Sequence, residues 1–106
     1  MITFDDFKKL NLIAATVRRV EDHPGADRLY LLTVDLGGEE RTLVAGIKKY
    51  YTPGELLGKQ LVVVENLEPA VIRGVESRGM ILAAQDGDAL SLVTLDRKIA
   101  PGAPVS

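Results

Sequence analysis

The chain has 106 residues, of which 46% are hydrophobic and 26% are charged, and 13 Lys and Arg against 15 Asp and Glu give a formal net charge of −2. This length and composition fit one domain with its own core and argue against a disordered chain. The charge excludes the strongly basic class of nucleic-acid coat proteins, so binding to phosphate would need a local basic face. The absence of Cys excludes disulfides and thiol chemistry, and no apolar run reaches the ~20 residues of a membrane helix.

The first ten residues predict a short capped helix and not a targeting signal. Acidic residues stand where a signal peptide carries Lys or Arg, so we expect a soluble, cytoplasmic protein. Thr3 and Asp6 have the spacing of a capping box, which predicts a helix over Phe4–Leu10. Its apolar residues share one face, and we expect that face to pack into the core. They are Phe4, Phe7 and Leu10.

Alternation of apolar and polar residues predicts three strands in the first half of the chain. The phase slips by one residue at Arg18-Arg19, which predicts a β-bulge in one long bent strand over Leu12–Glu21. A second strand, Leu29–Leu36, and a third, Glu40–Ala45, are separated by Gly37-Gly38, which is a hairpin signal.

The second half continues with short helical turns and further strands. The helical turns are predicted at Lys48–Tyr51 and Glu55–Leu57. Leu61–Val64 is a continuous apolar run, which predicts a strand covered on both faces. Residues 66–79, which contain Pro and Gly, are interpreted as a long excursion. The remaining predicted strands are Met80–Ala84 and Leu90–Leu95.

This order of elements predicts an all-β fold with short helices. Many short strands with one helix between the third and fourth strands is the order of an OB-fold, a five-stranded Greek-key barrel. Its first strand must bend to join both halves of the barrel, which suits the phase slip. Other small barrels are compatible with the same pattern. We expect residues 1–106 to form a single domain.

Residues that could carry catalysis are sparse. His23 is the only histidine and precedes Pro24 in a loop, so we interpret it as bonding a nearby backbone group and fixing the loop. Asp86-Gly87-Asp88 has the composition of an ordinary turn. Nucleophile-elbow, phosphate-loop and dinucleotide motifs are absent. The sequence therefore predicts no enzyme, no metal site and no cofactor.

Aromatic content limits the way in which the chain could bind nucleic acid. Phe and Tyr together make up 5% of the residues, too few for a long platform on which bases stack. Recognition would then rest on backbone contacts and on the shape of the nucleic acid.

Five short blocks, in order along the chain, carry a resemblance to a known family. Together they resemble the tRNA-binding domain found at the C-terminus of methionyl-tRNA synthetases, in free-standing tRNA-binding proteins and in EMAP-II-like synthetase cofactors. The resemblance runs over essentially the whole chain, and the OB-fold of the family agrees with the predicted strand order. The blocks are Asp6-Phe7-x-Lys9-Leu10, His23-Pro24-x-Ala26-Asp27-x-Leu29, Val34-Asp35-Leu36-Gly37, Asn66-Leu67-x-Pro69 and Ile72-Arg73-Gly74-Val75-x-Ser77-x-Gly79-Met80.

The resemblance implies largely sequence-independent binding to the outer corner of tRNA. The chain would act as an appendage or trans-acting cofactor of an aminoacyl-tRNA synthetase, in particular the methionyl enzyme. It also implies a homodimer, with the barrel in residues 12–80 and the dimer contact in a C-terminal β extension, residues 81–106.

Positions that match the motifs of the family supply the candidate binding residues. Arginine and lysine side chains would neutralise phosphates, whereas Asn and Ser would donate or accept hydrogen bonds. Met80 would offer an apolar contact, although it also fits a core position because it opens an apolar run. The candidate tRNA-binding residues are Arg28, Arg41, Lys59, Asn66, Arg73, Ser77 and Met80.

The sequence also departs from the family in ways that keep a second hypothesis open. Ile13-Ala14-Ala15 replaces the common Arg-Val-Gly, Val71 replaces a common Lys, and Ala45-Gly46 replaces a common Ser-Gly. Two positive charges are thereby missing. The alternative is a dimerisation or protein-binding, chaperone-like module on the same barrel without RNA binding. Chaperone relatives lack the His-Pro-x-Ala-Asp block, so its presence here favours tRNA binding.

Overall fold

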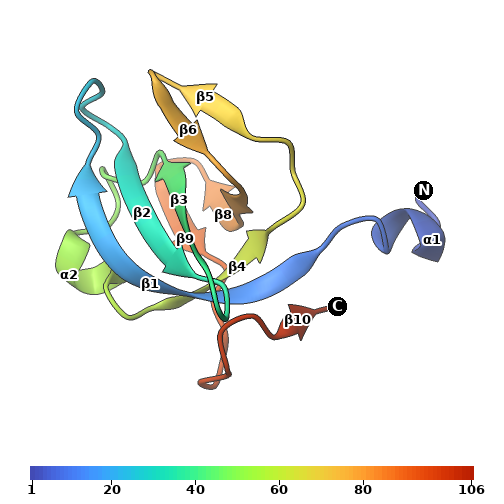
Figure 1. The fold of residues 1–106 in the computed structure, drawn as a ribbon. Coiled ribbons are helices and arrows are strands. Elements are labelled where there is room, and N and C mark those ends of the chain that lie inside the picture. Colours follow the sequence, from blue (N-terminus) through green and yellow to red (C-terminus); the bar gives the residue numbers. More distant parts are fainter.

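The computed structural model describes residues 1–106 as a curled antiparallel sheet with two one-turn helices and two outlying hairpins (Figure 1). Strands β3-β2-β1-β4-β7 follow one another in the sheet, and β10 pairs with β1. The mostly β class with short helices is confirmed. The elements are α1 (Phe4–Phe7), β1 (Leu12–Asp22), β2 (Tyr30–Asp35), β3 (Glu40–Ala45), α2 (Pro53–Leu56), β4 (Gln60–Val64), β5 (Ala70–Ile72), β6 (Val75–Ser77), β7 (Met80–Ile81), β8 (Ala83–Asp86), β9 (Ala89–Leu92) and β10 (Pro104–Val105).

The long strand β1 joins the two halves of the sheet, and the predicted bulge is confirmed. Its register on β2 passes from Val17 opposite Val34 to Arg19 opposite Thr33, so that Arg18 is the extra residue. A bulge bends a strand and increases its twist. The first half of β1 therefore pairs with β4 and the second half with β2, and the strand curves visibly (Figure 1).

The core lies inside this curl. Alternate residues of β2 point inward, and Leu32 and Val34 are fully buried. Every residue of Leu61–Val64 is buried, which confirms the prediction of a strand covered on both faces. Helix α2 adds Leu56, and β9 adds Leu92 to the same cluster. The helix thus plugs the end of the curl from which β4 starts.

Helix α1 does not pack into the core, contrary to the prediction. Its capping box between Thr3 and Asp6 forms as expected, but the helix ends at Phe7 and leaves Phe4 73% and Leu10 45% exposed. In Figure 1 it stands away from the sheet, and no other element packs against it. Neither α1 nor α2 is long and apolar enough to cross a membrane.

The second half of the chain contains more strands than the sequence indicated. Residues 66–79, expected as an excursion, contain the β5–β6 hairpin, whose strands of three residues are too short for alternation to show. The predicted strand Met80–Ala84 divides into β7 and β8, and all four residues of β8 are exposed. The C-terminus returns as β10 to the edge of β1.

The turn between β2 and β3 is stabilised by the carboxylate of Asp35. Its Oδ1 accepts from the backbone N–H of Gly37 at 2.8 Å, and its Oδ2 lies 2.9 Å from Nη2 of Arg18. The backbone N–H of Gly37, followed by the Arg18 side chain, holds the pKa of Asp35 below its ordinary value of 3.8. Both contacts are stronger with the charged carboxylate than with the protonated acid, so they weaken when Asp35 is protonated.

We expect Asp35→Asn to destabilise the protein near neutral pH and to have little effect in strong acid. A folded-state pKa below the unfolded value contributes stability above the unfolded pKa, and that stability is lost as the pH falls through the folded pKa. Thermal unfolding of both proteins between about pH 7 and pH 2.5 tests this. Asp96→Asn, at a side chain that is 96% exposed, is the control. An Asp35→Asn penalty of equal size at both ends of the range would contradict the expectation.

Candidate nucleic-acid interface

Two loops at one end of the sheet bring Arg28 and Arg73 together. Arg28 lies in the β1–β2 loop and Arg73 at the tip of the β5–β6 hairpin, and both line a cleft of about 340 Å³ with Ala26, Asp27 and Leu29. Figure 1 shows this loop and the hairpin tip at the top of the molecule. Neither arginine takes part in an ion pair. The cleft therefore carries more positive than negative charge.

Arg73 has an unfavourable backbone conformation. Its φ of 52° and the φ of 86° at Gly74 are both positive, as a type I′ hairpin turn requires. Asn or Gly is the preferred residue at the first of these positions, and Arg73 is the only non-glycine residue with positive φ in the chain. Strain of this kind accumulates at functional sites. The turn presents a long cationic side chain at its tip at some cost in backbone energy.

His23 fixes the β1–β2 loop, as the sequence predicts. Its side chain is 5% exposed, and Nδ1 accepts a hydrogen bond from the backbone N–H of Gly25 at 2.9 Å. The neck of the loop is closed by the backbone N–H of His23, which donates to the carbonyl of Leu29 at 3.0 Å. The backbone on which Arg28 stands is thereby held at both ends.

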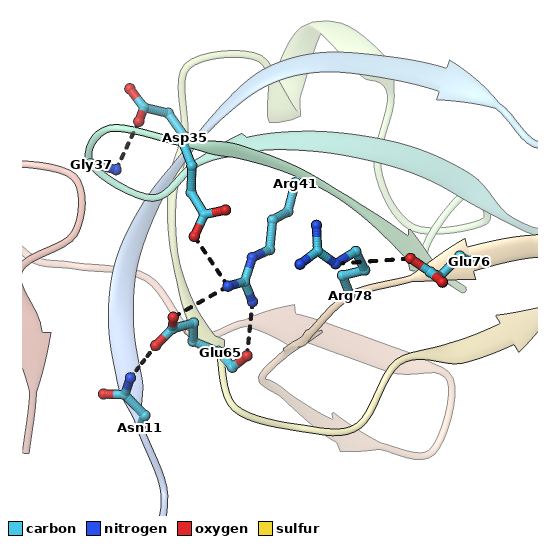
Figure 2. A network of polar contacts seen from close by, with 8 residues as sticks. Asn11, Asp35, Gly37, Arg41, Glu65, Glu76 and Arg78 are labelled. Atoms are coloured by element: carbon cyan, nitrogen blue, oxygen red, sulfur yellow. Dashed lines mark hydrogen bonds and ion pairs between the residues drawn. The ribbon is translucent and has the colours of Figure 1, made fainter.

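Arg41 belongs to a polar network within the protein (Figure 2), and it is not among the residues that line the cleft. Its Nη1 donates to the Glu65 carbonyl at 2.9 Å, and its Nη2 lies 3.3 Å from the Glu65 carboxylate and 3.1 Å from that of Glu39. The side chain is only 14% exposed. Two carboxylates already neutralise this guanidinium, so a phosphate contact would require Arg41 to leave them, and that contact stays a prediction.

The amide of Asn66 is likewise engaged within the protein. Its Oδ1 accepts from the backbone N–H of Asn11 at 2.8 Å, and its Nδ2 donates to the carbonyl of Lys9 at 2.7 Å. These bonds attach the segment between α1 and β1 to the end of β4. Asn66 therefore has an anchoring role in the fold, and its contact with RNA stays a prediction.

Ser77 is buried and serves the base of the β5–β6 hairpin. Its hydroxyl accepts from the backbone N–H of Val44 at 2.9 Å and donates to the carbonyl of Gly79 at 3.3 Å. Only 4% of the residue is exposed, and both hydrogen bonds of the hydroxyl stay within the protein. Ser77 thus attaches the hairpin to the edge of β3, and its contact with RNA stays a prediction.

We expect Ser77→Ala to lower the free energy of unfolding by roughly 1–2 kcal/mol, because a half-buried N–H loses its acceptor. Urea denaturation measures this loss. Below the unfolding transition, the dependence of RNA affinity on salt should match that of the wild-type chain, since no phosphate contact is removed. A change in that dependence without a loss of stability would return Ser77 to the RNA contacts.

Met80 and Lys59 lie apart from the cleft. Met80, in β7, pairs with Val64 of β4 and is 48% exposed, so the alternative that it is a core residue is wrong. Lys59 precedes β4, and the residues on either side of it line a different cleft of about 500 Å³. The cations of that cleft, which the sequence did not single out, are Arg18, Arg97 and Lys98.

Comparison with known families and proteins gives a consistent result. Residues 12–104 match the family described as "Putative tRNA binding domain". The chain is 53% identical over 104 residues to a methionine–tRNA ligase of Pyrococcus furiosus and 52% identical over 105 residues to that of Thermotoga maritima. These matches cover 98% and 99% of the chain but only 14% and 17% of the ligases. The chain thus spans a small part of the curated relatives it matches.

Solved structures share the fold over the full length. A methionyl-tRNA synthetase related protein of Pyrococcus horikoshii superimposes with a TM-score of 0.92 at 36% identity, covering 100% of this chain and 98% of that one. The chaperone CsaA of Bacillus anthracis superimposes with a TM-score of 0.91 at 28% identity, covering 100% and 99%.

Proposed function

Since the chain belongs to the tRNA-binding domain family, we propose that it binds tRNA at the end of the sheet where the β1–β2 loop meets the β5–β6 hairpin. The observation that carries this proposal is the cleft between these loops, which Arg28 and Arg73 line without an ion pair. Phosphate contacts supply most of the affinity of such proteins and carry no sequence information. Binding is therefore largely independent of sequence and performs no chemistry, and the resemblance to the family implies that it follows the outer corner of the tRNA.

The role that follows is to raise the local concentration of tRNA at an aminoacyl-tRNA synthetase, in particular the methionyl enzyme. Identity to methionine–tRNA ligases over nearly the whole chain supports this choice. The domain acts in cis as an appendage or in trans as a cofactor, in the cytoplasm. A titration of labelled tRNA on filters at two salt concentrations tests the binding. With ~3–5 phosphates contacted, micromolar affinity should fall by roughly 0.7–0.9 log units per phosphate for each log unit of salt.

We propose that the chain is a homodimer. Residues 81–106 include strand β8, whose four residues are all exposed, and the exposed Ile99. Phe4 in α1 and Leu10, which follows the helix, add to the apolar surface that a partner would cover. A second copy would double the cationic clefts available to one tRNA, which compensates for the negative net charge of the chain. Light scattering after gel filtration measures the mass, and a monomer at micromolar concentration would exclude the dimer.

A chaperone-like function is the second candidate, because the fold also matches CsaA and because exposed apolar side chains surround α1. Its distinguishing result would be suppression of aggregation of an unfolded client, together with salt-independent or absent binding of tRNA. Salt-dependent tRNA binding without such suppression would exclude it.

A further inference from the structure

The β5–β6 hairpin is attached to the rest of the protein at its base and at its tip. At the base, Ser77 accepts from Val44, and the backbone N–H of Arg78 donates to the carbonyl of Thr42 at 3.1 Å. At the tip, His23 is the only residue that joins residues 70–76 to another element by a hydrogen bond. Because a two-stranded hairpin is marginally stable by itself, the position of its tip depends on this second attachment.

The partners of His23 define its tautomer and its function as a bridge. Nδ1 faces the backbone N–H of Gly25, which can only donate, whereas Nε2 lies 3.0 Å from the carbonyl oxygen of Ile72, which can only accept. The ring is therefore neutral, with its proton on Nε2. One nitrogen shapes the β1–β2 loop, and the other bonds the residue that precedes Arg73.

We propose that His23 is a positioning residue for RNA: it holds the tips of the two loops in register, so that Arg28 and Arg73 face the same stretch of phosphate backbone. This inference rests on the proposed function. Two cations bind one anion tightly only when their separation is fixed beforehand, because otherwise ordering the loops opposes binding. Burial of the ring and the use of both its nitrogens supply that rigidity without any contact between His23 and RNA.

Two substitutions separate the bridge from the local turn. His23→Asn places an amide oxygen near the position of Nδ1 and keeps the acceptor for Gly25, but it does not reach Ile72. His23→Gln places an amide N–H near the position of Nε2 and keeps the bond to Ile72. His23→Asn should weaken tRNA binding by roughly threefold to tenfold, whereas His23→Gln should keep most of the wild-type affinity.

The positioning role also predicts that His23 acts through Arg73. In the Arg73→Ala background, His23→Asn should cause little further loss of affinity, whereas independent effects would multiply. Both variants are first checked for folding by circular dichroism. A His23→Asn variant that binds like the wild-type chain, or effects that multiply, would overturn the inference and leave the proposed function intact. A wild-type chain that does not bind tRNA would overturn both.

One measurement on the wild-type protein needs no variant. Nitrogen-15 NMR of the imidazole should show the neutral Nε2–H tautomer near neutral pH, with a proton that exchanges slowly because it is bonded to Ile72. A proton on Nδ1, or a mixture of tautomers, would mean that the bridge is absent and would overturn the inference.

Discussion

The Arg28→Ala/Arg73→Ala double variant is expected to bind tRNA roughly 30-fold more weakly than the wild-type chain. Each arginine is free of ion pairs and lines the same cleft, so each substitution removes an exposed, charge-assisted contact worth about 1 kcal/mol. Its second signature is the salt dependence of binding, whose slope should fall by about 1.4–1.8 for two lost phosphate contacts. Filter binding over a range of salt concentrations measures both quantities.

Arg97→Ala/Lys98→Ala is the matched control, because it also removes two positive charges, from exposed side chains that line the other cleft. It should leave the salt slope close to the wild-type value. Equal effects of the control and the double variant would mean that only overall charge matters. That result would remove the Arg28–Arg73 cleft from the interface.

Arg73→Asn separates the loss of a contact from damage to the fold. Asn tolerates positive φ in a type I′ turn better than Arg does, so this variant should be at least as stable as the wild-type chain. Its affinity for tRNA should nevertheless fall. Together these two results would mean that Arg73 is required for binding tRNA and not for the stability of the fold.

Periodicity in the sequence was sufficient for the strands that build the core. Alternation over Leu12–Glu21 has one phase slip, and the bulge lies at that position. One extra residue there keeps the apolar side chains before and after the slip on the inner face of the sheet. The run Leu61–Val64 has no polar face, so it had to be covered on both sides. Periodicity failed for β5 and β6, whose three-residue strands surround an unusual turn residue.

The candidate site was harder to predict than the core, because a residue type does not reveal whether the residue already has a partner. The sequence predicts that Arg41 is a free cation. In the structure, Glu65, which is 24 residues away in the sequence, neutralises it. The sequence predicts that Ser77 and Asn66 are free to bond a ligand. In the structure, both form hydrogen bonds with backbone groups of other segments. Arg28 and Arg73 lie together only because two loops, far apart in the sequence, meet at one end of the sheet.

The Arg41 network explains why one of the candidate arginines should affect stability and not binding. Arg41→Ala leaves the Glu65 carboxylate, which is 25% exposed, without its cation, and it disconnects β3 from the end of β4. Loss of one partner of a buried pair costs about 3–5 kcal/mol. Here Nε of Arg41 has no hydrogen-bond partner and both groups keep some solvent contact. We therefore expect a loss of roughly 2–4 kcal/mol in urea denaturation.

The double variant Arg41→Ala/Glu65→Gln identifies the cause of this loss. With no unpaired carboxylate left behind, it should be more stable than Arg41→Ala alone, so the two substitutions should not be additive. The salt slope of tRNA binding distinguishes the two roles of Arg41. A phosphate contact would reduce that slope by about 0.7–0.9 in Arg41→Ala, whereas a structural cation leaves it unchanged wherever the variant is folded. A reduced slope at wild-type stability would mean that Arg41 leaves Glu65 to bind RNA.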